Sequence, residues 1–536
     1  MTRLLPPLLL AHIASSAFAI SLPPLTRFVS ASYYSQSQQP LRSSLDLWIE
    51  KEEQVALDKL LANVKPFGRN VEDKGVADGT IIASPSTNEP NYYYQWVRDA
   101  AISTNTLVDI FAKSPFSKLS PSLTAILSAY ATLQSKLQRT TNPSGSFDDL
   151  SSLGEPKFRV DGTPFTEAWG RPQRDGPALR AITLISYLRA YNSSHPSLWN
   201  TRDGDDFYDL FYTAEMPARS VIKADLEYVS HNWDQTSFDL WEEVEGMHFF
   251  TAMVQLRALR EGAQIARAFG DTAAADWYAK QAQQMKKYVK RFWNKNKGHI
   301  VETLWSRRSG LDCGVLLGSL HALPSEDVGG DGQAIFPPWA DEVLVTLLRL
   351  VEDQSSRFPI NSKSDGPTDE EDNDEDASFT TWVMEGQLEG TGLGRYPEDI
   401  YDGYANSPNG GNPWFLCTSS AAEILYRTAS HFSTSSNFTI TSRGLPFYSA
   451  LLATSSLAPE ADVMYGPGHV MLHTIVERLK LVGDEFMEVV KTHVDADGGM
   501  SEQFDGVTGF MRGAGDLSWS YGAFLSAAGA RKALHL

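Results

Sequence analysis

Cysteine is scarce in this sequence, because only Cys313 and Cys417 occur among 536 residues. Two cysteines cannot form the dense disulfide framework of small secreted domains, so a hydrophobic core must hold the fold together. The chain can supply that core, since it is long and 42% of its residues are hydrophobic. The spacing of the two cysteines leaves open whether they pair.

The N-terminus lacks a hydrophobic run long enough for a membrane anchor. The apolar stretch around residues 8–10 is shorter than the roughly 20 residues that span a bilayer, and two prolines and a histidine interrupt it. A single arginine before it and small residues at positions 17–19 favour a cleaved secretory signal over residues 1–19. We expect a secreted, extracellular protein in which residues 20–42 form a flexible or processed leader. Sequons at Asn192 and Asn437 agree with glycosylation in the secretory pathway.

Positive charge is the third shortage. Lys and Arg number 46 against 66 Asp and Glu, which gives a formal net charge of -20. An acidic surface repels nucleic acid and anionic membranes, so we exclude both as partners and expect a neutral or cationic substrate. Residues 365–376 contain eight acids in twelve positions and predict a solvated loop, because they lack the ligand spacing of a calcium loop. We expect neither a metal nor a cofactor.

Helical patterns dominate the rest of the chain. Apolar residues recur at spacings of three and four, whereas alternating strand patterns are few. Gly270 and Asp271 supply a helix stop followed by a helix start. A toroid of paired helices would bring the intervening loops, rich in glycine, proline, aromatic and charged residues, to one end, where they line a pocket. The expected helices span residues 45–64, 178–191, 248–269, 272–293, 341–351, 419–432 and 468–493, and the loops span residues 92–99, 154–175, 238–246, 309–321, 394–414 and 501–519.

Two acidic segments, in separate loops, carry the chemistry. Glu242 lies in the stretch DLWEEV, and Glu502 lies in SEQ some 260 positions later. A pair of carboxylates from separate loops is what acid/base cleavage of a glycosidic bond requires. Glu242 should keep a proton, because it is flanked by Asp239 and Glu243 and lies beside Trp241. The alternative for Glu242 is a solvated helix start, where acidic residues are also favoured.

An ordered set of motifs gives this chain a family resemblance. The chain resembles the fungal glucoamylases, inverting exo-glucosidases of glycoside hydrolase family fifteen. The resemblance extends over nearly the whole chain from about residue 43 and is weaker around Asp312-Cys313-Gly314. The motifs are IIASPST (81–87), YYYQWVRD (92–99), GEPKF (154–158), WGRPQRDGPALRA (169–181), DLWEEV (239–244), GRYPED (394–399), GNPWFLCT (411–418), SEQ (501–503) and DLSWSY (516–521).

The resemblance implies an all-α fold, the (α/α)6 barrel, as a single catalytic domain over residues 43–536. It implies that Glu242 is the general acid and Glu502 the general base, with Tyr92 and Gln503 holding the attacking water. Glu243, which is adjacent to Glu242 and cannot share its role, is implied to bind substrate. Trp414 is left open between a pocket wall and the core. The other implied substrate ligands and pocket walls are Arg98, Asp99, Trp169, Asp239, Leu240, Trp241, Arg395 and Trp519.

These implications lead to a functional expectation. We expect a monomeric glucoamylase without cofactor that releases glucose from the non-reducing ends of starch and maltooligosaccharides. We expect no starch-binding domain, since Leu536 follows Trp519 by only 17 residues. The alternatives are a trehalase or other α-glucosidase on the same barrel, or a non-catalytic sugar-binding protein on an enzyme scaffold.

Overall fold

Helices make up most of the computed structural model, which describes residues 43–202, 204–324, 334–362, 386–435 and 437–534. The signal and leader expected over residues 1–42 lie outside the described residues. The acidic stretch at residues 365–376 lies outside them as well. The predictions for these segments therefore remain predictions.

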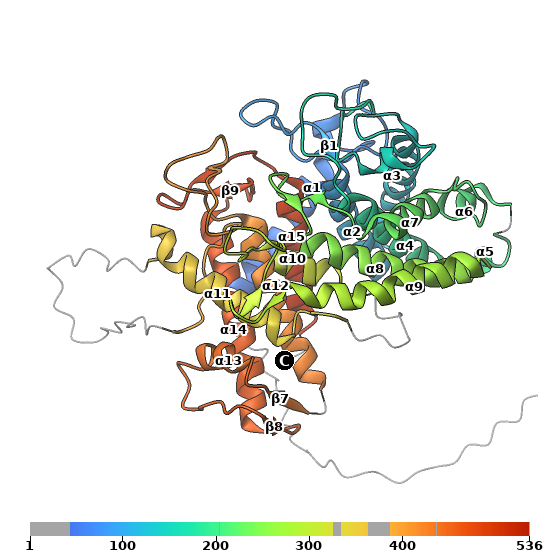
Figure 1. Cartoon of the computed structure of the whole chain (residues 1–536). Helices are drawn as coiled ribbons and strands as arrows, with labels where there is room; N and C mark the ends of the chain where they lie inside the picture. Colours follow the sequence, from blue (N-terminus) through green and yellow to red (C-terminus); the bar gives the residue numbers. More distant parts are fainter. Residues whose placement is uncertain (1–42, 203, 325–333, 363–385, 436, 535–536) are drawn as a thin grey trace, which may run out of the picture. The chain divides into compact units, whose positions relative to one another are not determined.

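Within the described residues, six helices form a closed inner ring and six more pack around it. Figure 1 shows these helices with their labels. Each inner helix packs against the next one along the chain, and the last returns to the first. Outer and inner helices alternate in sequence, so the architecture is an (α/α)6 barrel and the fold prediction is confirmed. The inner helices are α2 (Val97–Lys113), α4 (Asp175–Ser194), α8 (Phe249–Ala268), α10 (Gly314–His321), α12 (Phe415–Thr434) and α15 (Ser518–Lys532). The outer helices are α1 (Ser44–Ala62), α3 (Ser120–Arg139), α7 (Val221–Asn232), α9 (Thr272–Val289), α11 (Asp341–Arg357) and α14 (Val470–His493).

The two rings differ in how their residues are buried. The outer helix α9 buries one face and is capped by Asp271, whose side chain accepts a hydrogen bond from the Ala274 amide. The inner helix α10 is buried from Gly314 to Leu320 without interruption. A helix surrounded on all sides has no polar face and therefore no three-to-four periodicity. For this reason residues 314–321 were wrongly expected to be loop.

The expected helices are present, with differences at their ends. Residues 290–293 do not continue α9, because a 3-10 turn (Lys290–Phe292) and strand β5 (Trp293–Asn294) follow it. The periodicity did not reveal α2, α3, α7, α10 and α15. In α3 the apolar stripe is diluted by serine and threonine, which are weak helix formers.

Short elements fill the connections between the barrel helices. Hairpin-like strand pairs brace several loops, and all of these pairs are antiparallel. The pairs are β1 (Gln95–Trp96) with β2 (Lys157–Phe158), β3 (Ser237–Phe238) with β4 (Glu245–Gly246), β5 with β6 (His299–Ile300), β7 (Phe438–Ile440) with β8 (Val463–Tyr465), and β9 (Gln503–Phe504) with β10 (Met511–Arg512). The short helices are α5 (Pro196–Trp199), α6 (Asp206–Phe211) and α13 (Leu445–Leu451), and further 3-10 turns span Arg69–Val71, Ser151–Gly154 and Pro359–Asn361.

The segments with the expected site residues lead into the N-termini of the inner helices. Strand β1 runs directly into α2, the β3–β4 pair precedes α8, and the β9–β10 pair precedes α15. Arg98 and Asp99 lie in the first turn of α2, and Trp519 lies in the first turn of α15. Because a helix dipole places partial positive charge at the N-terminus, this end of the barrel favours carboxylates.

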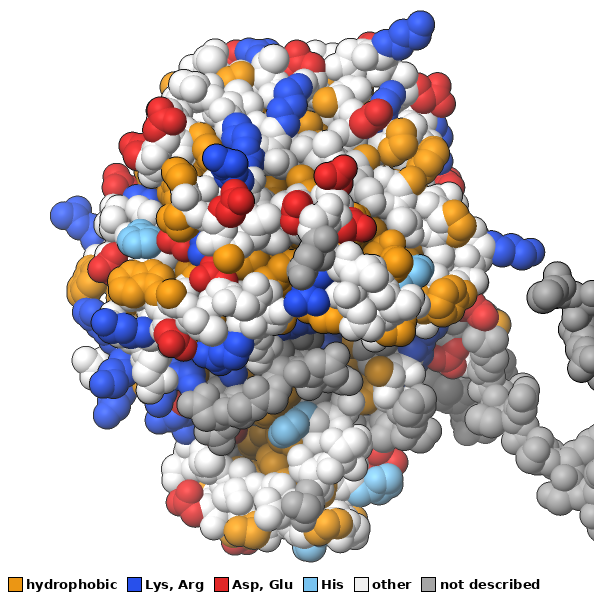
Figure 2. All heavy atoms as spheres, turned by 90° about the vertical axis from the view of Figure 1, so that its right-hand side faces the viewer, with side chains coloured by type: hydrophobic (Ala, Val, Ile, Leu, Met, Phe, Trp, Pro, Cys, Tyr) orange, Lys and Arg blue, Asp and Glu red, His pale blue; other side chains and the backbone are white. Residues whose placement is uncertain are grey.

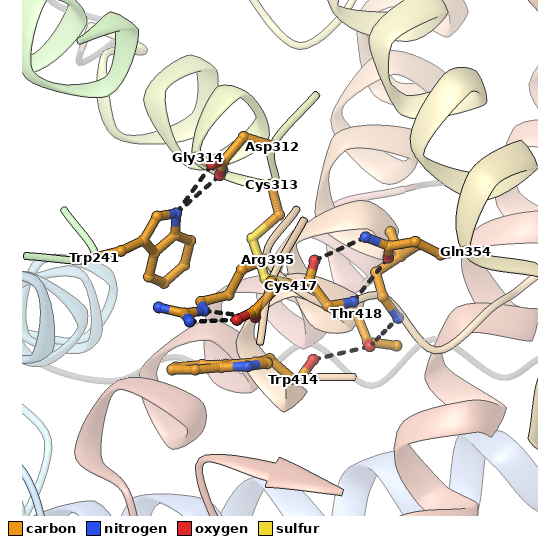
Figure 3. The surroundings of a disulfide bond; sticks show 12 residues. Trp241, Asp312, Cys313, Gly314, Gln354, Arg395, Trp414, Cys417 and Thr418 are labelled. Atoms are coloured by element: carbon orange, nitrogen blue, oxygen red, sulfur yellow. Dashed lines mark hydrogen bonds and ion pairs between the residues drawn. A yellow bond between two sulfur atoms is a disulfide. The ribbon is translucent and has the colours of Figure 1, made fainter. Parts of the chain in front are cut away.

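A disulfide joins the starts of two inner helices. Cys313, directly before α10, is bonded to Cys417 in the first turn of α12, with a Cα to Cα distance of 5.8 Å (Figure 3). The pairing that the spacing left open is thus decided by the fold, which brings together residues 104 positions apart. The bridge lies beside Arg395, whose carbonyl accepts a hydrogen bond from the Cys313 amide at 2.8 Å.

The described surface carries charges of both signs. On the face drawn in Figure 2, Lys and Arg side chains are interspersed with Asp and Glu side chains. The negative net charge is therefore not a continuous acidic field on this face. Among the described helices, none combines the length and the apolar character that crossing a membrane requires.

Candidate active site

A cavity of about 500 Å³ opens at the end of the barrel where the inner helices begin. Both Glu242 and Glu502 lie in its wall, together with most of the residues expected to bind substrate. Trp414, which sequence left between wall and core, also lines it. The lining comprises Ala83, Pro90, Tyr92, Trp96, Arg98, Asp99, Trp169, Gly170, Leu240, Trp241, Glu242, Glu243, Arg395, Tyr401, Tyr404, Asn406, Trp414, Glu502, Leu517 and Trp519.

Glu242 lies in the tight loop between β3 and β4. Its backbone has a φ of 68°, in the left-handed region that non-glycine residues rarely adopt, and its amide donates to the Asp239 carbonyl at 2.9 Å. Asp239 Oδ1 accepts the amides of Glu243 and Val244 at 2.7 and 3.0 Å. The buried Asp239 carboxylate thus holds the loop's own backbone and is not part of the cavity lining. Strained backbone of this kind persists where the surroundings enforce it, which is common at functional sites.

The Glu242 carboxylate contacts a cation and an amide. Its Oε1 accepts from Arg98 Nη2 at 3.3 Å and from Gln173 Nε2 at 3.0 Å. Arg98 Nη1 also donates to Gln173 Oε1 at 2.9 Å and to Asp175 Oδ2 at 3.1 Å. Both contacts of Glu242 use the same oxygen, so Oε2 makes neither of these bonds.

Glu502 has different surroundings. It is 2% exposed, and its Oε1 accepts a hydrogen bond from the Tyr92 hydroxyl at 2.8 Å. Burial raises the pKa of Glu502 to about 7, although the Tyr92 hydroxyl, Arg395 and the Tyr401 hydroxyl oppose the shift. The backbone approaches the carboxylate closely at Gly513, where φ is 72° and a Cβ would lie 2.5 Å from Glu502 Oε2. A carboxyl with a pKa near neutrality can accept a proton during a reaction.

Several polar groups in the wall have no hydrogen-bond partner among the described residues. They include Asp99 Oδ2 and the indole nitrogens of Trp414 and Trp519, all buried. Burial raises the pKa of Asp99 to about 6, even though Arg98 Nε lies 3.5 Å from Asp99 Oδ2 and opposes the shift. Since buried polar groups are normally bonded, this set predicts a ligand that both donates and accepts hydrogen bonds. The described residues contain no group of three or more His, Cys, Asp or Glu side chains arranged to hold a metal.

Comparison with known families agrees with this geometry. Residues 54–529 match the family model described as glycosyl hydrolases family 15. The chain belongs to glycosyl hydrolase family 15. Membership of this family makes it a glycoside hydrolase, as the paired carboxylates predicted.

Relatives of known sequence and structure cover nearly all of the chain. Glucoamylase GLU1 of Saccharomycopsis fibuligera is 35% identical over 529 residues, which are 96% of this chain and 95% of the relative. Glucoamylase-1 of Schizophyllum commune is 37% identical over 91% of this chain and 74% of its own. The solved glucoamylase of Saccharomycopsis fibuligera matches with a TM-score of 0.76 and 34% identity, over 91% of this chain and 96% of its own. The family 15 glucoamylase of Hypocrea jecorina has the same TM-score and identity, over 91% and 72%.

The residues that the family 15 resemblance implied do not all lie in the cavity. Gln503, expected to hold water, is buried behind Glu502, with its Nε2 3.5 Å from Glu502 Oε2. Its Oε1 accepts from Asn412 Nδ2 at 2.9 Å. Gln503 therefore lies between Glu502 and Asn412, outside the residues that line the cavity.

Glu243 forms an ion cluster at the cavity. Its carboxylate lies 2.9 Å from Arg395 Nη2 and 3.0 Å from Arg308 Nη2, and it accepts from the Tyr396 hydroxyl. Burial alone would raise the pKa of Glu243, but Arg395, Tyr396 and Arg308 outweigh it and hold the pKa below its usual value. The two sequence neighbours expected to keep Glu242 protonated, Asp239 and Glu243, are thus both engaged elsewhere.

Tryptophans form much of the family 15 cavity wall. The Trp241 indole donates to the Asp312 carboxylate at 3.0 Å (Figure 3). Its ring centre lies 5.5 Å from that of Trp414 and 6.5 Å from that of Trp519. Arg395 forms a two-point bond with the Asp399 carboxylate at 2.6 and 2.8 Å. These hydrogen bonds to Asp312 and Asp399 hold the Trp241 indole and the Arg395 guanidinium in place.

Sequence reasoning assigned no role to Lys157, which lies behind another part of this wall. Its Nζ is 3.8 Å from the ring centre of Trp169 and 4.2 Å from those of Tyr94, Trp96 and Phe165. Burial lowers the pKa of Lys157 to about 8, although the Glu242 charge opposes the shift. An ammonium inside four rings stabilises them by cation–π attraction. Only the fold could reveal this, because the rings come from two separate loops.

Proposed function

We propose that this chain is a secreted glucoamylase that removes glucose from the non-reducing ends of starch-like α-glucans with inversion at the anomeric carbon. The observation that carries the proposal is the placement of Glu242 and Glu502, from loops far apart in sequence, in the wall of one cavity with different surroundings. The names of the relatives support the substrate class, because they are glucoamylases. The unpartnered polar groups of the wall suit a polyol.

In the proposed reaction, protonated Glu242 gives its proton to the glycosidic oxygen as the bond from that oxygen to the anomeric carbon breaks. Ionised Glu502 takes a proton from a water that attacks the same carbon from the opposite face. The products are β-glucose and a glucan shortened by one unit. Solvent then returns a proton to Glu242 and removes one from Glu502.

Substrate binding is assigned to other groups. We assign Arg98 and Asp99, which line the cavity, to bond the hydroxyls of the terminal glucose, and Glu243 with Arg395 forms a second charged pair at the cavity. Trp169, Trp241, Trp414 and Trp519 supply apolar walls for the sugar faces. Leu240 contributes a small apolar contact.

Proton NMR early in the reaction tests the inverting assignment. An inverting glucoamylase should produce β-glucose first from maltoheptaose, before mutarotation. Initial α-glucose would reject inversion. Assays on maltose, isomaltose and trehalose separate a glucoamylase from a trehalase, and absence of turnover on all of these substrates would favour a sugar-binding protein.

Secretion also gives a proposal for glycosylation. Asn437 is exposed directly before β7, whereas Asn192 lies in α4 and its Oδ1 accepts from the Tyr208 hydroxyl at 2.9 Å. We propose that Asn437 carries a glycan and that Asn192, which lies within helix α4 and whose amide oxygen accepts a hydrogen bond, is the poorer acceptor. Mass spectrometry of the secreted protein measures both.

A further inference from the structure

A small turn in the cavity wall presents an aromatic ring that the functional assignment leaves unused. Tyr401 and Asn406 form an isolated antiparallel bridge, and the chain reverses between them. Asp402 Oδ1 accepts the amides of Tyr404 and Ala405, both at 3.0 Å, and Gly403 adopts a φ of 95°. The turn therefore has a defined conformation, with Tyr404 at its tip.

A guanidinium supports the Tyr404 ring. Arg512 lies 5.0 Å from the ring centre. It is anchored by the carbonyl and carboxylate of Asp402 at 2.8 and 2.9 Å, and by the Asp505 carboxylate at 3.3 Å. Cation–π attraction therefore holds the ring from one side. Tyr404 is nevertheless 50% exposed while lining the cavity, so part of its surface is open to a ligand.

The turn is also tied to the Glu502 part of the cavity. The Tyr401 hydroxyl lies 3.2 Å from the Tyr92 hydroxyl, which donates to Glu502. Asn412 Nδ2 bonds both the Asp402 carbonyl, at 3.2 Å, and Gln503 Oε1. In addition, Arg512 is the strand partner of Gln503. The position of the Tyr404 ring is therefore fixed relative to Glu502.

We propose that Tyr404 is a stacking platform for an outer glucose unit of the substrate, beyond the unit held at Glu242 and Glu502. The ligand class is an α-glucan of at least three units, and the Asn406 amide, which lines the same wall, bonds its hydroxyls. A flat ring with a fixed orientation suits the apolar face of a sugar. The inference rests on the proposed glucan-hydrolase function.

The test compares substrates of different length. In Tyr404→Ala, the ratio of kcat/KM for maltoheptaose to kcat/KM for maltose should fall roughly threefold to tenfold, as expected for a lost aromatic stacking contact. Tyr404→Phe keeps the ring and should keep the ratio within about twofold. Arg512→Met should lower the ratio by an intermediate amount, since the ring loses its support. Phe510→Ala is the matched control, because Phe510 is 78% exposed between β9 and β10 and does not line the cavity.

The stacking platform is rejected if the ratio of kcat/KM for maltoheptaose to kcat/KM for maltose is unchanged in Tyr404→Ala. The ratio would also be unchanged if both substrates lost activity equally. Binding separates this failure from failure of the proposed function. In the Glu242→Gln background, calorimetry with maltoheptaose should give a Kd that rises roughly threefold to tenfold on adding Tyr404→Ala. A wild-type protein that cleaves no α-glucan would reject the proposed function. An unchanged Kd would reject the platform alone.

Discussion

Glu242 and Glu502 are the same residue type in one cavity, yet their surroundings differ in kind. The Glu242 side contains a guanidinium, an amide and further carboxylates, and the Glu242 side chain is 14% exposed. The Glu502 side contains phenol hydroxyls, and the carboxylate is almost fully buried. The two carboxylates therefore have different electrostatic surroundings, whereas the separate roles proposed for an acid and a base come from the family 15 resemblance.

The largest expected effect concerns chemistry. Glu242→Gln and Glu502→Gln should each lower kcat for maltoheptaose on the order of a hundredfold or more, because each removes a proton transfer. The fold should persist by circular dichroism. Glu245→Gln, on exposed β4 of the same hairpin as Glu242, is the control and should keep its activity.

An activated substrate sharpens this comparison. The fluoride of α-D-glucosyl fluoride leaves without protonation, so Glu242→Gln should regain much of its activity on it, whereas Glu502→Gln should not. Recovery in the opposite order would reverse the two roles. Near-normal maltoheptaose hydrolysis by folded Glu502→Gln would remove the base assignment.

The second effect concerns stability against pH. The pKa of Glu502 rises from 4.5 to about 7 on folding, because burial disfavours the anion. The folded state then binds this proton more tightly than the unfolded state, so the contribution of Glu502 to the stability of the wild type falls between about pH 4.5 and 7 and is level above that range. This pKa shift of Glu502 corresponds to a loss of about 3 kcal/mol in the free energy of unfolding at pH values above the range. Glu502→Gln should therefore be more stable than the wild type at pH 8 but not at pH 4.

Chemical denaturation at both pH values measures this effect. Glu242→Gln should behave differently and be destabilised, because the buried Arg98 guanidinium loses one carboxylate partner. If the stability difference between Glu502→Gln and the wild type is equal at pH 4 and pH 8, the claim that burial raises the pKa of Glu502 is wrong.

The smallest effect concerns one hydrogen bond. The Tyr92 hydroxyl lowers the pKa of Glu502, so Tyr92→Phe should raise that pKa by about one unit. Since Glu502 must be ionised to act as base, the acidic limb of kcat/KM should move to higher pH. Tyr93→Phe, whose hydroxyl bonds the Asn70 carbonyl outside the cavity lining, should leave the limb in place. A limb that stays in place or moves to lower pH in Tyr92→Phe would show that the bond does not stabilise the anion.

Sequence reasoning found the loops of the site but not the orientation of each side chain. Glu242 and Glu502 were found because each carboxylate has aromatic or amide neighbours in sequence, and the ordered family motifs then favoured a catalytic acid over a solvated helix start for Glu242. Asp239 was expected at the substrate, yet its carboxylate bonds the amides of Glu243 and Val244. Its direction follows from the left-handed backbone at Glu242, which no local pattern reveals.

The sequence by itself determined the helical class, the loops that line the cavity and the two carboxylates, because these depend on local periodicity and on distinctive residue clusters. Tertiary structure alone decided the closure of the inner ring, the Cys313–Cys417 bond, the packing of four aromatic rings around Lys157 and the support of Tyr404 by Arg512. Each of these joins residues from separate segments. Their distances arise only when the barrel forms and brings these separate segments together, so no neighbouring residue encodes them.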